Sequence, residues 1–173
     1  AYAAMAALYH RKETGKGQLV EAVTSEVMLH YFPEAVLDCG MNNRVQGPTG
    51  NRDTSMAPQG CYPCKGVDNW LVLSVGSDEE WEALRRAMGD PEWARDRAFA
   101  TVLGRHYNHD ELDNRLSQWT REQDHIDLMR RLQDGGVTSG AVLDQKELFE
   151  DPHMHHRGFF EELSQPATGT HLY

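Results

Sequence analysis

Apolar and polar residues follow two different periods in the middle of the chain. The run WLVLSV at residues 70–75 is aliphatic and β-branched, and it is too short for a helix. Gly, Asp and Asn precede it within residues 65–69, which is the composition of a tight reversal. The pattern therefore predicts a buried strand over 70–75, paired as a hairpin with residues 59–65.

A helix is expected directly after this strand, over residues 78–88. Trp81 and Leu84 fall on one face at helical spacing. Ser77 can accept a hydrogen bond from the first free amides of the helix, and Glu80 can reach back to the amide of Ser77. This capping box makes the central unit a strand, a turn, a strand and a helix.

The remainder of the C-terminal part alternates between the helical and the extended period. Two amphipathic helices are predicted at 109–119 and 122–134, and the second is stopped by Gly135 and Gly136. A helical turn after Asp90, a loop anchored by Phe99 and a short helix at 145–149 are also expected. Strands are predicted at 137–142 and 159–163, and residues 170–173 are read as the start of another.

The N-terminal part has a different character. An alanine-rich helix is predicted from Ala1, with Gly15 and Gly17 breaking it before a strand at 18–23. Thr24 or Ser25 can cap a further helix that runs to about residue 39 and bends or restarts at Pro33. Periodicity then gives way to Gly, Asn, Pro, Thr, Asp and Ser over residues 40–58, which indicates a loop or linker.

The first helix offers almost no polar face, so it is expected to be covered on more than one side. No Met and no N-cap signal precede Ala1. These features predict that the chain lacks its native N-terminus. The alternative is ordinary processing of the initiator Met, with the helix buried in this same domain.

Charge and composition restrict the functional class. A formal net charge of −10 argues against sequence-independent nucleic-acid binding, because such binding needs many Lys and Arg to neutralise phosphates. No apolar stretch approaches the roughly 20 residues that cross a bilayer, so no membrane partner is expected. Three cysteines, an odd number, make a disulfide framework unexpected and predict a cytoplasmic protein.

Three short constellations carry candidate chemistry. Cys61 and Cys64 have CxxC spacing, which fits a redox pair or half of a zinc site, but residues three apart on a strand point to opposite faces. The histidines at 153, 155 and 156 lie near Asp151, yet no second ligand group has helical i, i+4 spacing. Neither constellation is therefore assigned a metal.

The third constellation is Gly50-Asn51-Arg52. Glycine permits close backbone approach, and arginine supplies a forked cation for a substrate or coenzyme group. A solvated linker is the alternative interpretation.

An ordered series of motifs resembles the family III CoA-transferases, the group of formyl-CoA transferase, carnitine CoA-transferase and α-methylacyl-CoA racemase. The match covers nearly the whole chain. Its motifs are His10-Arg11, Thr14 to Gln18 before a strand, Gly50-Asn51-Arg52, Ala57 to Cys64 with Gly66 in the turn, the strand to Trp81, Gly136-Val137, Asp151-Pro152-His153, and Arg157 to Phe160.

The resemblance implies an α+β fold centred on the small domain of that family. A short antiparallel sheet would pack against several helices, preceded by a helix-strand-helix remnant of a Rossmann-like large domain. The expected divisions are 1–43 for the large-domain segment, 44–58 for the linker, 59–163 for the small domain, and 164–173 for the start of the return to the large domain.

The resemblance also implies the chemistry, which is CoA transfer between an acyl-CoA and a carboxylic acid through an aspartyl intermediate, or the related racemisation. The nucleophilic aspartate is expected upstream of Ala1, so no catalytic residue is assigned and the chain alone is expected to be inactive. Coenzyme A is a substrate, no separate cofactor is implied, and a homodimer is expected. The candidate substrate- or CoA-binding residues are Gly50, Asn51, Arg52, Gln59 and Gly60.

The alternative hypothesis is a non-catalytic binding or assembly module derived from a truncated CoA-transferase gene. The coding sequence upstream of Ala1 discriminates between them. A glycine-rich Rossmann segment that ends in an aspartate would support the enzyme, and a start codon would support the module.

Overall fold

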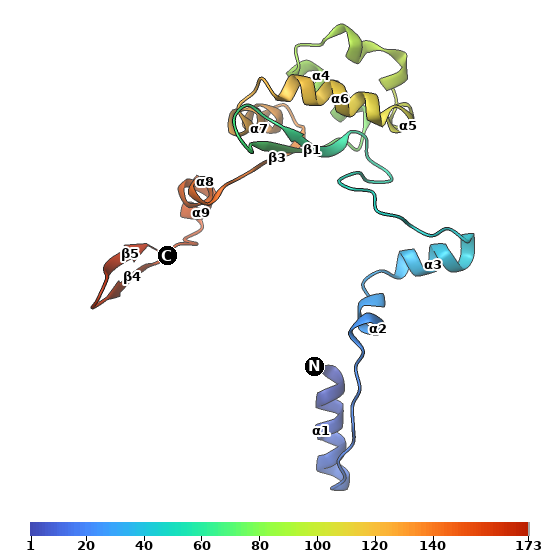
Figure 1. Ribbon diagram of the computed structural model, residues 1–173, viewed down its shortest axis with the longest axis vertical. Helices are drawn as coiled ribbons and strands as arrows, with labels where there is room; N and C mark the ends of the chain where they lie inside the picture. The colour runs from blue at the N-terminus through green and yellow to red at the C-terminus, as the bar shows by residue number, and fades with distance from the viewer. Residues whose placement is uncertain (173) are drawn as a thin grey trace. The chain divides into compact units, whose positions relative to one another are not determined.

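The computed structural model describes residues 1–172, and the chain divides into two compact units between Pro48 and Thr49 (Figure 1). The first unit contains three helices, which are α1 (Tyr2–Thr14), α2 (Thr24–Leu29) and α3 (Pro33–Asn42). Helix α1 ends at Gly15 and α3 at Asn43, both in the left-handed conformation that closes helices. The restart of the helix at Pro33 is confirmed, because proline opens α3.

Two expectations for the first unit are wrong. Residues 18–23 form no strand, because a strand needs a hydrogen-bonded neighbour and none of residues 1–172 supplies one there. Helix α2 begins after Val23 without a side-chain cap, so neither Thr24 nor Ser25 caps it. Helix α1 also contains no buried residue, and Tyr2 is 90% exposed. The apolar sequence of this helix had predicted that its side chains would be buried.

The second unit begins with a hairpin and carries most of the secondary structure. Its elements are β1 (Gln59–Pro63), β2 (Trp70–Ser74), α4 (Asp78–Ala87), the 3-10 turns η1 (Glu92–Arg95) and η2 (Arg97–Phe99), α5 (Val102–Tyr107), α6 (His109–Thr120), α7 (His125–Asp134), β3 (Thr138–Val142), α8 (Gln145–Glu150), α9 (Pro152–His156), β4 (Glu162–Gln165) and β5 (Gly169–Leu172).

The main sheet has three antiparallel strands in the order β1-β2-β3. Its register pairs Cys61 with Val72 and Val72 with Gly140. The reversal between β1 and β2 uses Gly66 at φ 113° and Asp68 at φ 60°, positions where glycine and aspartate are tolerated. The predicted hairpin is therefore confirmed.

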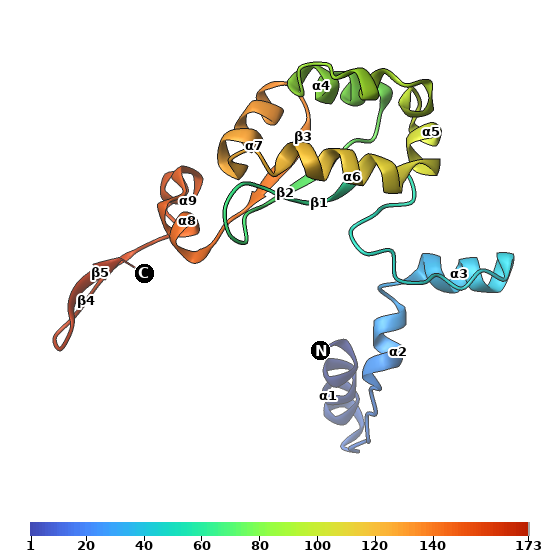
Figure 2. The ribbon, with the colours of Figure 1, turned by 45° about the horizontal axis from the view of Figure 1, so that its top comes forward.

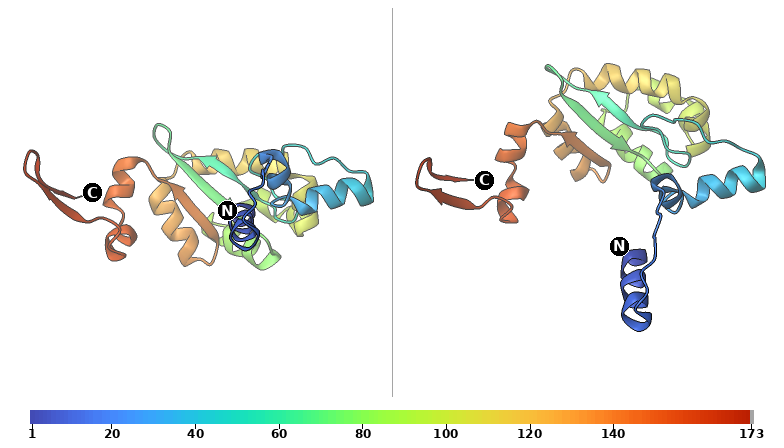
Figure 3. Two further views of the ribbon diagram at one scale, coloured as in Figure 1. Left: turned by 90° about the horizontal axis from the view of Figure 1, so that it is seen from below. Right: turned by 60° about the horizontal axis from the view of Figure 1, so that its bottom comes forward.

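One face of this sheet carries the core. Alternate residues of β1 and β2 are buried, and α6 runs beside β1 (Figure 2 and Figure 3). The opposite face is open, since Val72 and Val142 are 45% and 44% exposed. The largest apolar side chains that are fully buried in the core are Leu71, Leu73, Trp81, Leu84, Leu112, Leu116, Leu128 and Leu132, and the aromatic rings of Tyr62 and Phe99 are almost fully buried beside them. The fold class is thus confirmed as α+β, with a short antiparallel sheet packed against helices.

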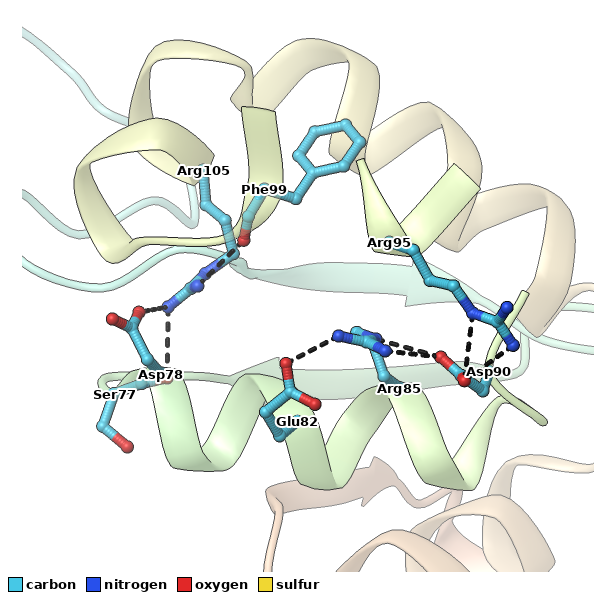
Figure 4. Close-up of polar contacts among 8 residues, drawn as sticks. All are labelled: Ser77, Asp78, Glu82, Arg85, Asp90, Arg95, Phe99 and Arg105. Atoms are coloured by element: carbon cyan, nitrogen blue, oxygen red, sulfur yellow. Dashed lines mark hydrogen bonds and ion pairs between the residues drawn. The ribbon is translucent and has the colours of Figure 1, made fainter. Parts of the chain in front are cut away.

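Arg105 ties this core to the loop before β1. Its side chain is fully buried, and the guanidinium donates to the carbonyls of Ala57, Phe99 and Ser77 at 2.7, 3.1 and 3.1 Å. A further bond of 3.0 Å joins it to Asp78 (Figure 4). A buried guanidinium is tolerated only when its donors are largely satisfied, and these partners take four of its five N–H groups.

Asp90, just beyond the C-terminal end of α4, also joins two segments through its side chain. Figure 4 shows Arg85 and Arg95 converging on its carboxylate, with Arg85 donating from Nε and Nη2 at 3.1 and 2.7 Å. The two guanidiniums hold the pKa of Asp90 below its ordinary value, with the hydrogen bond from Arg85 as the largest cause. This contact fixes the turn from α4 into η1.

Several boundaries differ from the sequence prediction. Asp124 caps α7 by accepting from the amides of Ile126 and Asp127, so that helix starts three residues later than expected. The strand expected at 159–163 is β4 at Glu162–Gln165, which pairs with β5. The expected strand start at 170–173 is met by β5 as far as Leu172, and Tyr173 lies outside the described residues. The short helices α5 and α9 were not predicted.

No helix within residues 1–172 combines the length and the apolar content needed to span a bilayer.

The capping box at α4 is half confirmed. Ser77 accepts from the amide of Glu80 at 3.2 Å, but the Glu80 carboxylate accepts from the amide of Gly76 at 2.6 Å instead of from Ser77. The Glu80 carboxylate therefore satisfies the amide of the residue before the cap and not that of the cap itself.

We expect Ser77→Ala to lower the free energy of unfolding by about 0.5–2 kcal/mol, because it leaves a helix-terminal amide without its acceptor. Chemical denaturation of the C-terminal unit measures this. Ser25→Ala, in a helix that Ser25 does not cap, is the control and is expected to leave the midpoint unchanged. An unchanged midpoint for Ser77→Ala would show that the cap contributes nothing.

Candidate functional site

A tight turn brings the predicted site residues together beside β1. The amide of Arg52 donates to the carbonyl of Thr49 at 3.3 Å, and Gly50 takes a φ of 65°, which favours glycine. Gly50, Asn51 and Arg52 thereby face Gln59 and Gly60 across two adjoining hollows of about 460 and 280 Å³. All five predicted residues line both hollows, and their role in binding stays a prediction.

The two hollows share the turn and β1 but extend in different directions. The larger reaches across the open face of the sheet to Val72 and Ser74. The smaller reaches along the edge of β1 to Asp113 and Ser117 on α6. We call the two together the β1 hollow.

Arg52 is held by two carboxylates of α6. Its Nη2 donates to Asp110 at 2.7 Å, and its Nε donates to Asp113 at 3.1 Å. Nη2 also donates to Asp113. Among the described residues only Nη1 of this guanidinium lacks a partner, so Arg52 fastens the turn to α6 instead of presenting a free fork.

Asp113 is the centre of this cluster. Its second oxygen accepts from the hydroxyl of Tyr62 at 2.7 Å. Burial raises the pKa of Tyr62, and the hydrogen bond to Asp113 raises it further, so the phenol is a neutral donor. One carboxylate therefore joins the turn, the strand β1 and the helix α6.

His109 lies beside this carboxylate and is almost fully buried. Its Nε2 accepts from the amide of Gln59 at 3.3 Å and lies 3.6 Å from Asp113. Burial lowers the pKa of His109, and the neighbouring charge of Asp113 opposes that shift. Burial prevails, because the Gln59 amide needs an acceptor and only the neutral imidazole provides one at Nε2.

Besides the bond between Tyr62 and Asp113, helix α6 is fastened at two points to backbone groups of β1. His109 bonds the amide of Gln59 near one end, and the Thr120 hydroxyl donates to the carbonyl of Pro63 at 2.8 Å near the other. Asp113 and Ser117 line the hollow between these points. The smaller part of the β1 hollow is therefore a gap between a strand and a helix that are joined on both sides of it.

The reactive groups around the hollow are restrained. Both oxygens of Asp113 accept hydrogen bonds, which reduces its strength as a nucleophile. Cys61 lines the hollow, and burial raises the pKa of its thiol, so the thiolate is disfavoured. The arrangement is thus suited to binding and positioning a ligand.

Neither of the other two constellations enters this site as a group, since Cys61 lines the hollow but Cys64 does not. Cys64 is buried while Cys61 is partly exposed, and burial raises the pKa of Cys64 to about 11. His155 bonds the carbonyl of Phe149 at 2.7 Å, and His153 lines a separate hollow with Arg157. Within residues 1–172, no group of three or more His, Cys, Asp or Glu is placed to hold a metal.

Sequence reasoning missed Tyr62, His109 and Asp113. A signal was present for two of them, since His109 and Asp113 are four residues apart and so lie on one face of the predicted helix. Their connection to Arg52 and Tyr62 spans more than 50 residues and has no local pattern.

We expect the stability of the C-terminal unit to fall as the pH drops below about 6.5, the pKa of an unperturbed histidine. The folded pKa of His109 lies below the unfolded one, so the contribution is complete above the unfolded pKa and is lost as the pH falls through the folded value. The free energy of unfolding is measured between pH 7.5 and 5, and its slope against pH is the test. Each unit of difference between the folded and the unfolded pKa contributes about 1.4 kcal/mol to that change.

His109→Gln keeps an acceptor for the Gln59 amide but cannot titrate, so its slope in this window should be smaller. His30→Gln, in the first unit, is the control and should keep the parent slope. Equal slopes for His109→Gln and the parent chain would contradict the account of His109.

Comparison with known proteins identifies the family to which the chain is related. The model of CoA-transferase family III matches residues 1–173. A probable CoA-transferase of Mycobacterium tuberculosis is 31% identical over 163 residues, which is 94% of this chain and 20% of that protein. Succinyl-CoA–D-citramalate CoA-transferase of Chloroflexus aurantiacus is 30% identical over 169 residues, 98% of this chain and 42% of that protein.

A solved structure agrees on the fold. The CAIB/BAIF family protein from Brucella suis superimposes with a TM-score of 0.75 at 23% identity, over 98% of this chain and 47% of that one. The chain spans less than half the length of these relatives. On the family match over its whole length, the chain belongs to CoA-transferase family III.

Proposed function

We propose that this chain is part of an enzyme that transfers CoA between an acyl-CoA and a carboxylic acid. The observation that carries the proposal is the family match over residues 1–173. The names of the relatives support it, since they include a succinyl-CoA:mesaconate and a formyl-CoA:oxalate CoA-transferase. Coenzyme A is then a substrate, and the reaction needs no separate cofactor.

Within this enzyme, the role that we assign to the present chain is to bind a ligand in the β1 hollow. Gly50, Asn51, Gln59 and Gly60 surround it with backbone and amide groups, and Arg52 fixes its rim. A hollow of this size falls in the range of about 300–1,000 Å³ that small-molecule sites occupy.

The transfer would proceed through an aspartyl intermediate. A carboxylate oxygen attacks the thioester carbonyl, the C–S bond breaks, and an anhydride and the CoA thiolate form. The thiolate then attacks the aspartyl carbonyl, releasing the donor acid and leaving an aspartyl-CoA thioester. The acceptor acid attacks that thioester and takes the CoA by the same two steps in reverse.

Asp113 is unsuited to this role. One oxygen faces the cation of Arg52 and the other accepts from Tyr62, so attack on a thioester would have to break both contacts. Asp113 is therefore not the nucleophile, and we place that role on an aspartate upstream of Ala1, as the resemblance to the family III CoA-transferases implies.

The assembled enzyme is proposed to be a cytoplasmic homodimer. Exposed apolar side chains in the first unit, among them Tyr2, Met5 and Leu29, favour association. The same exposure would suit the alternative function, a non-catalytic assembly module.

The test is an exchange assay on the product of the complete reading frame that encodes these residues, compared with residues 1–173 alone. Succinyl-CoA and formyl-CoA serve as donors, and oxalate and mesaconate as acceptors. We expect exchange by the complete product and none above buffer by the chain alone. Absence of exchange by the complete product would favour the assembly module, and turnover by residues 1–173 would refute the external nucleophile.

Hydroxylamine sharpens this experiment. It attacks the aspartyl thioester, frees CoA and leaves a hydroxamate on the aspartate, which peptide mass spectrometry locates. The proposal places the modification outside residues 1–172, and modification of Asp113 would contradict it.

A further inference from the structure

The charge of the β1 hollow argues against a carboxylate ligand. Among the described residues, Arg52 is the one cation that lines it, and Asp110 and Asp113 both pair with this guanidinium. The cluster of these three side chains therefore carries a net charge of −1. A ligand carboxylate would have to compete with two resident carboxylates for the same guanidinium, which costs free energy through like-charge repulsion.

The edge of β1 offers unpaired backbone groups in the same place. Along an antiparallel pair, hydrogen-bonded and non-bonded residue pairs alternate. Cys64 bonds the carbonyl of Asn69, so the alternation leaves Cys61 opposite Val72 in a non-bonded pair, with its N–H and C=O directed away from β2. The amide of Gln59 and the carbonyl of Pro63 point the same way, and both find partners on α6.

Cys61 has no such partner on α6. It lies between the two bonded residues of β1, where the strand and the helix enclose the smaller part of the hollow. Among the described residues, none bonds its backbone from that side. One donor and one acceptor are thus presented to the hollow at the spacing that a neighbouring extended amide chain would meet.

The remaining lining is polar without charge, or apolar. Asn51 and Gln59 carry side-chain amides, and Ser117 carries a hydroxyl. Val72, 45% exposed, forms an apolar floor on the open face of the sheet. Nη1 of Arg52 adds two donors that suit a carbonyl oxygen as well as an anion.

We propose that the β1 hollow binds the pantetheine arm of an acyl-CoA, in extended form along the outer edge of β1, and that it does not bind the carboxylate of the acid substrate. Pantetheine is uncharged and carries two amides, each with one donor and one acceptor, which match the groups that line the hollow. This inference rests on the proposed function and names the part of the substrate that this chain holds.

The experiment follows the backbone amides of the isotope-labelled chain by NMR during titration with pantetheine, with succinate and with CoA. We expect pantetheine and CoA to shift the amides of Gly50, Asn51 and Cys61, and succinate at equal ionic strength to leave them in place. Val72→Trp fills the floor of the hollow and should weaken pantetheine binding at least tenfold. Val142→Trp, equally exposed on the same face but outside the hollow, should leave binding unchanged.

Three outcomes would overturn the inference. They are succinate shifting the same amides as strongly as pantetheine, Val72→Trp binding as well as Val142→Trp, and pantetheine and CoA shifting nothing in the hollow. If CoA shifts residues elsewhere and the hollow stays silent, the inference fails while the proposed function stands. If pantetheine binds in the hollow but the complete enzyme shows no exchange, the proposed function fails and the inference stands.

Discussion

The carboxylate of Asp113 is the contact on which the site depends. It accepts from Arg52 on one oxygen and from Tyr62 on the other, and it lies next to His109. Each partner comes from a different segment, so the turn, the first strand and helix α6 are joined at one point. The side chain of Asp113 is only 27% exposed, which limits the screening of these bonds by water.

Two arginines hold the loop that leads into the site. Arg52 is bonded to α6 at the start of residues 52–57, and Arg105 bonds the carbonyl of Ala57 at their end. A loop fixed at both ends loses most of its conformational entropy when the chain folds. Ligand binding therefore does not have to order it again. The hollow is preformed for this reason, although its walls come from a loop, two strands and a helix.

Local patterns predicted much of the C-terminal unit. The run at 70–75, the reversal at Gly66 and the helix opened by Ser77 are each encoded within a few neighbouring residues, and all three are present. The five candidate binding residues also come together, because Gly50 turns the chain and the bonds of Arg52 to α6 hold that turn beside β1. The prediction of a strand at 18–23 was wrong, since a segment with extended periodicity becomes a strand only when it can hydrogen-bond to a neighbouring strand. The Asp113 cluster could not be predicted, because its members are separated by more than 50 residues and their types also suit a solvated helix face.

A double-mutant cycle on Arg52 and Asp113 tests the central claim, that this pair joins the turn to α6, most directly. The free energies of unfolding of the parent chain, Arg52→Gln, Asp113→Asn and the double variant give the coupling between the two side chains. The account predicts a coupling of about 1–2 kcal/mol, above the roughly 0.5 kcal/mol expected for the exposed Glu111–Arg115 pair on the same helix. Additive effects, with a coupling no larger than that of Glu111 and Arg115, would contradict it.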